Sequence, residues 1–301
     1  MSTRRTFLRQ TAAISAGLGF LPLSQACQSA MKDSRFVSNI GLQLYTVREA
    51  LAEAPADTLQ KIAQMGYHQV ETMTVQSLGE MVPMIQDAGL KVNSSFMQWS
   101  VLTGRWDLLG MSSPGYAMEE LIDSAARYEL EYVVFGYLMP EERGTLDDYK
   151  AIIDQLNEAG EQFAELGVQL CYHNHNFEFM EMEGTTPFDV MIERFDPEMV
   201  KFEFDVFWAS LAGWDPLATM ERLGGRMAQV HLKDKRKGEP VVFANEEAKP
   251  EAFKELGQGE VDIRKVIQLA ESYNVAHCHV EQDHSPNPLN SIETSLSYLR
   301  S

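Results

Sequence analysis

The sequence predicts a single (β/α)8 TIM barrel of the α/β class, preceded by an export signal. Eight short apolar runs alternate with eight amphipathic stretches along the 301 residues of the chain. Alternation of this kind predicts a parallel sheet, and eight such units predict that the sheet closes into a barrel. Barrels of this class commonly reach this length as one domain, so the size of the chain calls for no second domain.

The predicted strands and helices follow one another at regular intervals. The strands are Ile40–Tyr45, Gln69–Thr72, Lys91–Phe96, Tyr132–Tyr137, Gln169–Tyr172, Lys201–Phe204, Gln229–Leu232 and Ala276–Val280. The helices are Leu51–Met65, Leu78–Ala88, Met118–Tyr128, Leu146–Leu166, Pro187–Phe195, Pro216–Leu223, Ile263–Tyr273 and Leu289–Leu299. Gly66, Gly89 and Gly167 stand where helix C-caps are expected. The polar segment Lys233–Pro250 lies in the longest predicted connection, and we expect it to cover part of the barrel mouth.

The first 26 residues have the order of an export signal. Arg4 and Arg5 form a twin-arginine pattern, and the apolar run Ala12–Leu23 and small residues follow. This order predicts a cleaved signal peptide rather than a membrane-spanning helix. We therefore expect a signal peptide over residues 1–26, a polar linker over 27–37 and the barrel over 38–301. The mature chain is expected outside the cytoplasm, in the periplasm or as a membrane-anchored lipoprotein.

Cys27 leaves open whether the exported chain carries a lipid anchor. A lipobox usually has an aliphatic residue three positions before the cysteine, but Ser24 stands there and Leu23 lies one position too early. The other two cysteines, Cys171 and Cys278, fall inside predicted strands, where buried thiols are common. The sequence therefore predicts no disulfide framework.

The charge of the chain restricts its partners. The formal net charge is −19, with 44 acidic residues against 25 lysines and arginines. Binding to a nucleic acid or to an anionic membrane usually needs a basic surface. The composition therefore argues against nucleic acid as a partner and favours a small molecule.

Polar residues of the metal-binding type close the last four predicted strands. His173 and His175 follow the fifth strand, Asp205 the sixth, His231 lies in the seventh, and Glu281 follows the eighth. Each of them alone is more often a turn, cap or structural residue than a ligand. In a (β/α)8 barrel, however, the C-terminal ends of the strands meet at one mouth. Imidazole and carboxylate together suit one divalent ion such as Mn, Co, Mg, Fe or Zn, so the pattern predicts a metal site.

Several segments resemble the xylose isomerase-like TIM-barrel superfamily, which includes sugar phosphate isomerases and epimerases, inosose dehydratases and family 2 endonucleases. The similarity runs from Ser38 to the C-terminus and rests on Gly41–Arg48, Gly66–Glu71, Tyr172–His175, Phe204–Trp208, Val230–Asp234 and Leu256–Glu260. The resemblance implies a divalent metal with Asp205, His231 and Glu281 at three ligand positions. His173 stands at the fourth, where many relatives have a glutamate.

The resemblance and the ligand pattern together predict proton removal next to a carbonyl of a keto-sugar or glycoside. A metal that polarises the carbonyl lowers the barrier to this step, and a positioned base takes the proton. His175, Glu178 and Glu281 are the candidate bases. Lys233 is expected to hold an enolate or leaving-group oxygen, or else to form a salt bridge with Asp234 or an acid of a neighbouring strand.

Four further residues are expected to contact the substrate because they lie near strand ends. They are Gln43 and Tyr45 of the first strand, Glu71 of the second, and Trp208 after the sixth. Their position at the mouth is the reason for this expectation. The aromatic members can stack on a sugar face, although aromatic side chains near strand ends also pack in the core.

The sequence leaves the outcome of the reaction open. A sugar isomerase or epimerase is one reading, and a keto-sugar dehydratase or lyase that works by β-elimination on a 3-keto-glycoside is the other. His173 weakens the epimerase reading, because a neutral histidine ligand cannot serve as the carboxylate base of a glutamate. A non-catalytic sugar-binding barrel would be expected to have lost ligand positions, and a DNA-repair endonuclease would need a positive track for the phosphates. Export fits substrates outside the cytoplasm, including keto-sugars supplied by a partner oxidoreductase.

Overall fold

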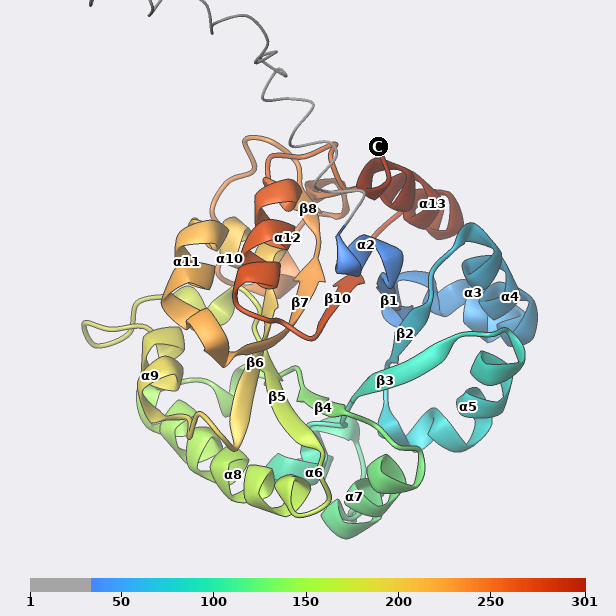
Figure 1. The fold of residues 1–301 in the computed structure, drawn as a ribbon. Coiled ribbons are helices and arrows are strands. Elements are labelled where there is room, and N and C mark those ends of the chain that lie inside the picture. The colour runs from blue at the N-terminus through green and yellow to red at the C-terminus, as the bar shows by residue number, and fades with distance from the viewer. Residues whose placement is uncertain (1–33) are drawn as a thin grey trace, which may run out of the picture.

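Eight parallel strands form a closed barrel in the computed structural model, which describes residues 34–301 (Figure 1). In order around the barrel, the strands are β1 (Gly41–Gln43), β2 (Gln69–Thr72), β3 (Lys91–Phe96), β4 (Tyr132–Phe135), β5 (Gln169–His173), β6 (Val200–Asp205), β7 (Met227–Leu232) and β10 (His277–Val280). Strand β10 pairs with β1 and closes the ring. The predicted fold class and all eight predicted strands are thereby confirmed. The predicted signal peptide, Cys27 and the linker up to residue 33 lie outside the described residues.

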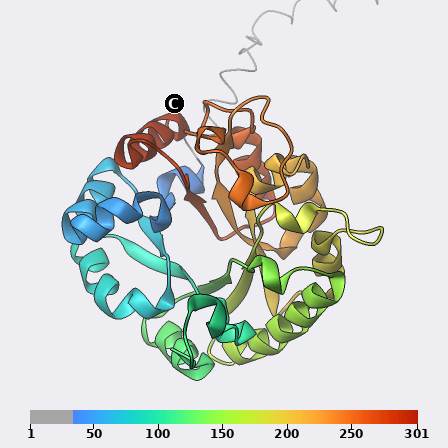
Figure 2. The same ribbon diagram turned by 180° about the vertical axis from the view of Figure 1, so that it is seen from behind.

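Helices surround the barrel on the outside, as the two opposite views show (Figures 1 and 2). They are α2 (Arg35–Ser38), α3 (Arg48–Glu53), α4 (Pro55–Met65), α5 (Leu78–Asp87), α6 (Ser100–Thr103), α7 (Met118–Arg127), α8 (Leu146–Ala164), α9 (Pro187–Arg194), α10 (Val206–Leu211), α11 (Pro216–Leu223), α12 (Ile263–Ser272) and α13 (Pro288–Leu299). Within residues 34–301, no helix has the length and apolar character needed to cross a bilayer.

Two segments near the start of the barrel differ from the prediction. The predicted helix Leu51–Met65 is divided at Ala54, whose φ of −150° and ψ of 74° are not helical. Pro55 explains the division, because a proline disfavours the helical conformation of the residue before it and is itself well placed in a first helical turn. The predicted linker over 27–37 overlaps helix α2, in which Phe36 and Val37 are buried.

The three glycines expected as helix ends have left-handed backbone conformations. Gly66 is the C-cap of α4 with φ of 103°, and Gly89 and Gly167 follow α5 and α8 with φ of 80° and 75°. A residue with a side chain rarely adopts this conformation, so glycine ends these helices and turns the chain toward the next strand.

Strand β6 shows how the sequence directs polar groups into the barrel. Successive side chains of a strand point to opposite faces. Phe202 and Phe204 point outward and contact Phe188 of α9, with ring centroids 5.5 and 6.3 Å away. Glu203 and Asp205, which alternate with them, point into the barrel and are fully buried. The apolar run therefore carries two carboxylates on its inner face.

The connection between β7 and α12 forms a small sheet of its own. Strands β8 (Asp234–Lys235) and β9 (Phe253–Lys254) pair antiparallel, and most of the predicted loop Lys233–Pro250 lies between them. The Asp234 carboxylate accepts hydrogen bonds from the backbone N–H groups of Gly257, Gly259 and Val261 at 2.9, 2.9 and 3.0 Å. A Cβ atom at Gly259 would collide with this carboxylate. Asp234 and the glycines therefore fix the return of this loop to the barrel.

Candidate active site

A cavity of about 530 Å³ opens at the C-terminal ends of the strands. This volume lies within the usual range for sites that bind small molecules. Seven of the predicted site residues line it, namely Gln43, Tyr45, His173, His175, Trp208, Lys233 and Glu281. The connection between β7 and α12 also reaches the cavity, where Asn245, Ala248 and Phe253 are part of the wall.

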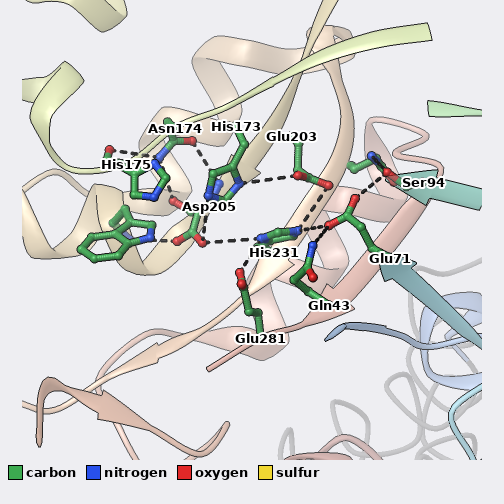
Figure 3. A network of polar contacts seen from close by, with 12 residues as sticks. Gln43, Glu71, Ser94, His173, Asn174, His175, Glu203, Asp205, His231 and Glu281 are labelled. Atoms are coloured by element: carbon green, nitrogen blue, oxygen red, sulfur yellow. Dashed lines mark hydrogen bonds and ion pairs between the residues drawn. The ribbon is translucent and has the colours of Figure 1, made fainter. Parts of the chain in front are cut away.

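The four predicted metal ligands converge (Figure 3), and two of them, His173 and Glu281, line this cavity. Asp205 Oδ2 lies 4.0 Å from His173 Nε2 and 3.8 Å from His231 Nδ1. His231 Nδ1 lies 2.8 Å from Oε2 of Glu281. All four side chains are buried. Four strands that are distant in sequence thus bring two imidazoles and two carboxylates together.

The main chain and an amide side chain hold Asp205 in place. Its Oδ1 accepts a hydrogen bond of 2.9 Å from the backbone N–H of Trp208, so Asp205 caps helix α10. Asn174 bridges the ends of β5 and β6, because its side chain accepts from the Asp205 N–H at 3.0 Å and donates to the Asp205 carbonyl at 3.2 Å. These bonds leave Oδ2 turned toward the histidines.

This donor set fits a divalent metal ion. Two histidine nitrogens and two carboxylate oxygens are ligands that divalent transition metals accept. The other ring nitrogen of His231, Nε2, lies 2.7 Å from Oε1 of Glu71. A carboxylate on the second nitrogen is the arrangement that orients metal-binding histidines. His173, Asp205, His231 and Glu281 are therefore the residues that would hold the ion.

Lys233 lies among the carboxylates of the same site. Its Nζ is 3.0 Å from Asp205 Oδ2, 2.8 Å from Glu281 Oε2 and 2.7 Å from Asp283 Oδ1. Burial alone would lower the pKa of Lys233, but these three carboxylates raise it well above its ordinary value. Burial would likewise raise the pKa of Glu281, but Lys233 and His231 bring it down to about 2. Lys233 is thus a buried ammonium group whose partners do not include Asp234.

His175 lines the cavity beside His173. The two ring centroids are 5.0 Å apart, so both rings lie on one side of the chain, as their spacing predicts. The imidazole of His175 stacks on Phe177 and contacts Trp208 at centroid distances of 5.4 and 5.1 Å. Burial lowers the pKa of His175 to about 3, so the ring is neutral at neutral pH but only weakly basic.

Glu178 and Glu71 lie outside the cavity. Glu178 accepts hydrogen bonds from the Tyr172 hydroxyl at 2.7 Å and from the backbone N–H of His175 at 2.9 Å. Both oxygens of Glu178 therefore accept hydrogen bonds from the protein. Glu178 is better placed to position His175 than to remove a proton from a substrate. Glu71 accepts a hydrogen bond of 2.8 Å from Gln43 Nε2 and does not line the cavity. Its contacts are therefore with other side chains and not with the space that a substrate would occupy.

Aromatic side chains form much of the cavity wall. They are Tyr45, Phe96, Trp99, Tyr137, Trp208 and Phe253. Tyr45 is 42% exposed, and the Arg48 guanidinium lies 4.1 Å from its ring centroid. The indole N–H of Trp208 has no hydrogen-bond partner among residues 34–301. Aromatic faces with a free donor nearby are suited to a ligand that has both apolar and hydroxylated faces.

Three residues of this region were missed in the sequence because they lie close to more obvious ones. Glu203 and His279 stand two positions before Asp205 and Glu281, and Asp283 stands two positions after Glu281. The alternation of side chains along a strand places Glu203 and His279 on the same face as Asp205 and Glu281, so this rule was the available signal for these two. Asp283 lines the cavity, and burial raises its pKa to about 6 against the lowering effect of Lys233.

Comparisons of the sequence with known proteins identify the family of the barrel. The family described as xylose isomerase-like TIM barrel matches residues 59–301. The inosose dehydratase of Clostridium tetani is 26% identical over 159 residues, which are 50% of this chain and 53% of that protein. The inosose dehydratase of Geobacillus kaustophilus is 34% identical over 101 residues, or 32% of each chain. The chain thus spans about half, or less, of the length of these curated relatives.

Solved structures share the fold over most of both chains. A sugar phosphate isomerase/epimerase from Parabacteroides distasonis superposes with a TM-score of 0.67 and 22% identity, covering 88% of this chain and 94% of that one. A 3-keto-D-glucoside 4-epimerase from E. coli superposes with a TM-score of 0.61 and 15% identity, covering 87% and 98%. Sequence identities this low establish a shared fold and not a shared activity. With the family match over residues 59–301, it follows that the chain belongs to the xylose isomerase-like TIM-barrel family.

Proposed function

We propose that this protein is a divalent-metal-dependent enzyme that removes a proton next to the carbonyl of a small keto-sugar, keto-polyol or keto-glycoside. The observation that carries the proposal is the convergence of Glu281, Lys233 and His175 at the bottom of an aromatic-lined cavity. This combination offers a base, a buried ammonium group and surfaces for a sugar ring within one small space.

Each residue of the site has a separate role in this reaction. His173, Asp205, His231 and Glu281 would hold the metal, which when bound polarises a carbonyl oxygen and makes the neighbouring proton more acidic. The neutral imidazole of His175 is positioned to accept that proton, and Glu281 is the second candidate. The Lys233 ammonium group stabilises negative charge on a substrate oxygen or donates a proton to a departing one.

The distribution of ionisable groups favours β-elimination over epimerisation. His175, Lys233, Glu281 and Asp283 belong to the β5–β10 side of the cavity, whereas the lining residues between Met73 and Tyr137 include no carboxylate, histidine or lysine. Epimerisation by two bases needs a group on each face of the carbon. Elimination needs a base and a proton donor, which can stand on the same side.

The names of the curated relatives support the same choice. The matched proteins from Clostridium tetani and Geobacillus kaustophilus are both inosose dehydratases, although the matches cover only part of each protein. We therefore propose a keto-sugar dehydratase or lyase, with isomerisation or epimerisation through the same proton removal as the alternative. We further propose that the protein acts outside the cytoplasm on keto-sugars made by an oxidoreductase, and that Cys27 is the residue that would carry a lipid anchor.

The proposal is tested by following the substrate proton directly. Metal-loaded protein is incubated in D2O with keto-inositols, keto-sugars and 3-keto-glycosides, and NMR records deuterium next to the carbonyl together with the products. We expect exchange with at least one class, accompanied by loss of water or of the glycosidic alcohol. Exchange with retention of all substituents would select epimerisation or isomerisation instead.

A pair of variants connects this reaction to the site. Asp205→Asn keeps an oxygen for the cap of α10 but removes the ligand charge, so we expect loss of bound metal and a rate lower by about 10²–10³-fold. Asp215→Asn is the matched control, because Asp215 caps the next helix, α11, away from the cavity. Full activity of Asp205→Asn, or no exchange with any substrate, would contradict the proposal.

A further inference from the structure

A second group of buried ligand-type side chains lies beneath the mouth of the barrel. It consists of Glu71 from β2, Glu203 from β6, His231 from β7 and His279 from β10, and each of them is 0% exposed. One ligand atom from each residue lies within 4.8 Å of those of the other three. Only His231 also belongs to the proposed mouth site, so the other three residues have no role there as ligands.

Two members of this interior group make no hydrogen bond with other residues of the described chain, although Glu203 lies at ion-pair distance from two histidines. Neither oxygen of Glu203 and neither ring nitrogen of His279 has a hydrogen-bond partner among residues 34–301. The ring nitrogens closest to Glu203 are His231 Nε2 at 3.3 Å and His173 Nδ1 at 3.5 Å. Burying a polar group without a hydrogen bond costs free energy of folding. A bound ligand that contacts these atoms would remove this cost.

The charges of the group point to a cation. Two carboxylates, Glu71 and Glu203, lie side by side at the Nε2 atom of His231 (Figure 3). The buried ammonium of Lys233 contacts the carboxylates of the mouth and not these two. A divalent ion would balance both negative charges, and two carboxylates with imidazole nitrogens form a donor set typical of Zn, Mn, Fe or Co.

The surroundings hold the interior ligands in position. Gln43 and Ser94 both donate hydrogen bonds to Glu71, and Gln229 donates to Ser94 Oγ at 2.9 Å. A Cβ atom at Gly41 would collide with Cδ2 of His279, so glycine at this position makes room for the ring. Hydrogen bonds that orient ligands in this way are characteristic of built metal sites.

We propose that Glu71, Glu203 and His279 form a second divalent-cation site in the barrel interior. His231 stands between the two sites, since its Nδ1 faces Glu281 at the mouth and its Nε2 faces Glu71 and Glu203. His231 therefore contacts carboxylates of both sites, and its Nε2 hydrogen bond with Glu71 connects them. The interior site does not depend on the substrate proposed above, because it lies below the residues that line the cavity.

Metal counting on single variants distinguishes the two sites. Purified protein is stripped with a chelator, reloaded with Mn²⁺ or Zn²⁺, desalted and measured by mass spectrometry. We expect about two ions per wild-type chain and about one in Glu203→Gln, in His279→Gln and in Asp205→Asn. The double variant Glu203→Gln/Asp205→Asn should retain none. His277→Gln is the control, because His277 lies two residues before His279 in β10 and outside the group.

The possible outcomes separate the interior site from the proposed function. A single ion in the wild type that persists in Glu203→Gln and His279→Gln would overturn the interior site and leave the mouth site intact. A single ion that is lost only in those two variants would confirm the interior site and contradict the metal placement at the mouth. No ion in any form would contradict both.

A measurement on the unmodified chain covers the case in which the variants fail to fold. Crystals of the wild-type protein loaded with Mn²⁺ or Zn²⁺ are examined by anomalous diffraction at the absorption edge of the metal. We expect one anomalous peak among Glu71, Glu203 and His279 and another among the mouth ligands. Ordinary water density in the interior group, with no anomalous signal there, would overturn the proposal.

Discussion

The Nζ atom of Lys233 lies 2.8 Å from Oε2 of Glu281, an oxygen that is also positioned to bind a metal ion. The same ammonium group contacts Asp205 Oδ2 at 3.0 Å, so two of the proposed ligand oxygens already have a cationic neighbour. Lys233 therefore balances the buried carboxylates when the ion is absent. Asp205 and Glu281, which would help to hold the ion, would keep Lys233 as a neighbour.

This relationship predicts that Lys233→Met destabilises the metal-free protein strongly. The substitution keeps most of the side-chain volume but leaves buried carboxylates without their cation, which typically costs about 3–5 kcal/mol. Added metal should recover more stability in the variant than in the wild type. Urea unfolding with chelator and with metal measures both quantities. Lys265→Met is the control, because Lys265 is 64% exposed and its ion pair with Asp262 should contribute roughly 0–1 kcal/mol.

Glu178 predicts a dependence of stability on pH that the variant Glu178→Gln should lack. Burial raises the pKa of Glu178 from 4.5 to about 7, so between these values the folded chain holds a proton that the unfolded chain has released. The contribution of Glu178 to the free energy of unfolding is therefore fully present at low pH and is lost as pH rises through about 7. The free energy of unfolding falls by at most about 1.4 kcal/mol per pH unit in this range. Chemical unfolding from pH 4 to 8 records the slope. An unchanged slope in Glu178→Gln, or an equal change in the exposed Glu181→Gln, would show that Glu178 is not its source.

Tyr45 is expected to contribute to substrate binding rather than to chemistry. It lines the cavity and is 42% exposed, so its removal leaves no cavity in the core. We expect Tyr45→Ala to raise KM roughly two- to tenfold with little change in kcat, corresponding to a loss of about 0.5–1.5 kcal/mol of stacking. Leu166→Ala, an exposed position that is not part of the cavity wall, should leave both constants unchanged. A fall in kcat alone would argue against this role.

The twin-arginine pattern predicts export in the folded state. The double substitution Arg4→Lys/Arg5→Lys keeps the charge but removes the arginine pair, and it should retain the protein in the cytoplasm. Arg9→Lys should have no effect. Cell fractionation measures the distribution, and intact-mass analysis of the exported chain reveals whether Cys27 carries lipid. Normal export of the double variant would contradict the predicted pathway.

The sequence determined the barrel and the position of its mouth. Strand and helix periodicities are local properties, and so are the left-handed glycines Gly66, Gly89 and Gly167 that end helices. Because parallel strands of a barrel end at one mouth, the order of His173, Asp205, His231 and Glu281 was enough to predict that they meet. Proline at position 55, which divides a predicted helix, was a local signal as well.

Only the tertiary structure decided which partner each polar side chain has. Lys233 contacts three acids from two other strand ends, Glu178 turns away from the cavity toward Tyr172, and Glu71 contacts His231 across 160 positions of sequence. Sequence spacing gives the face of a strand on which a residue lies, but not its depth in the barrel. Burial and contact between charges depend on how eight strands are staggered against one another, and this long-range packing alone created the interior group around Glu203 and His279.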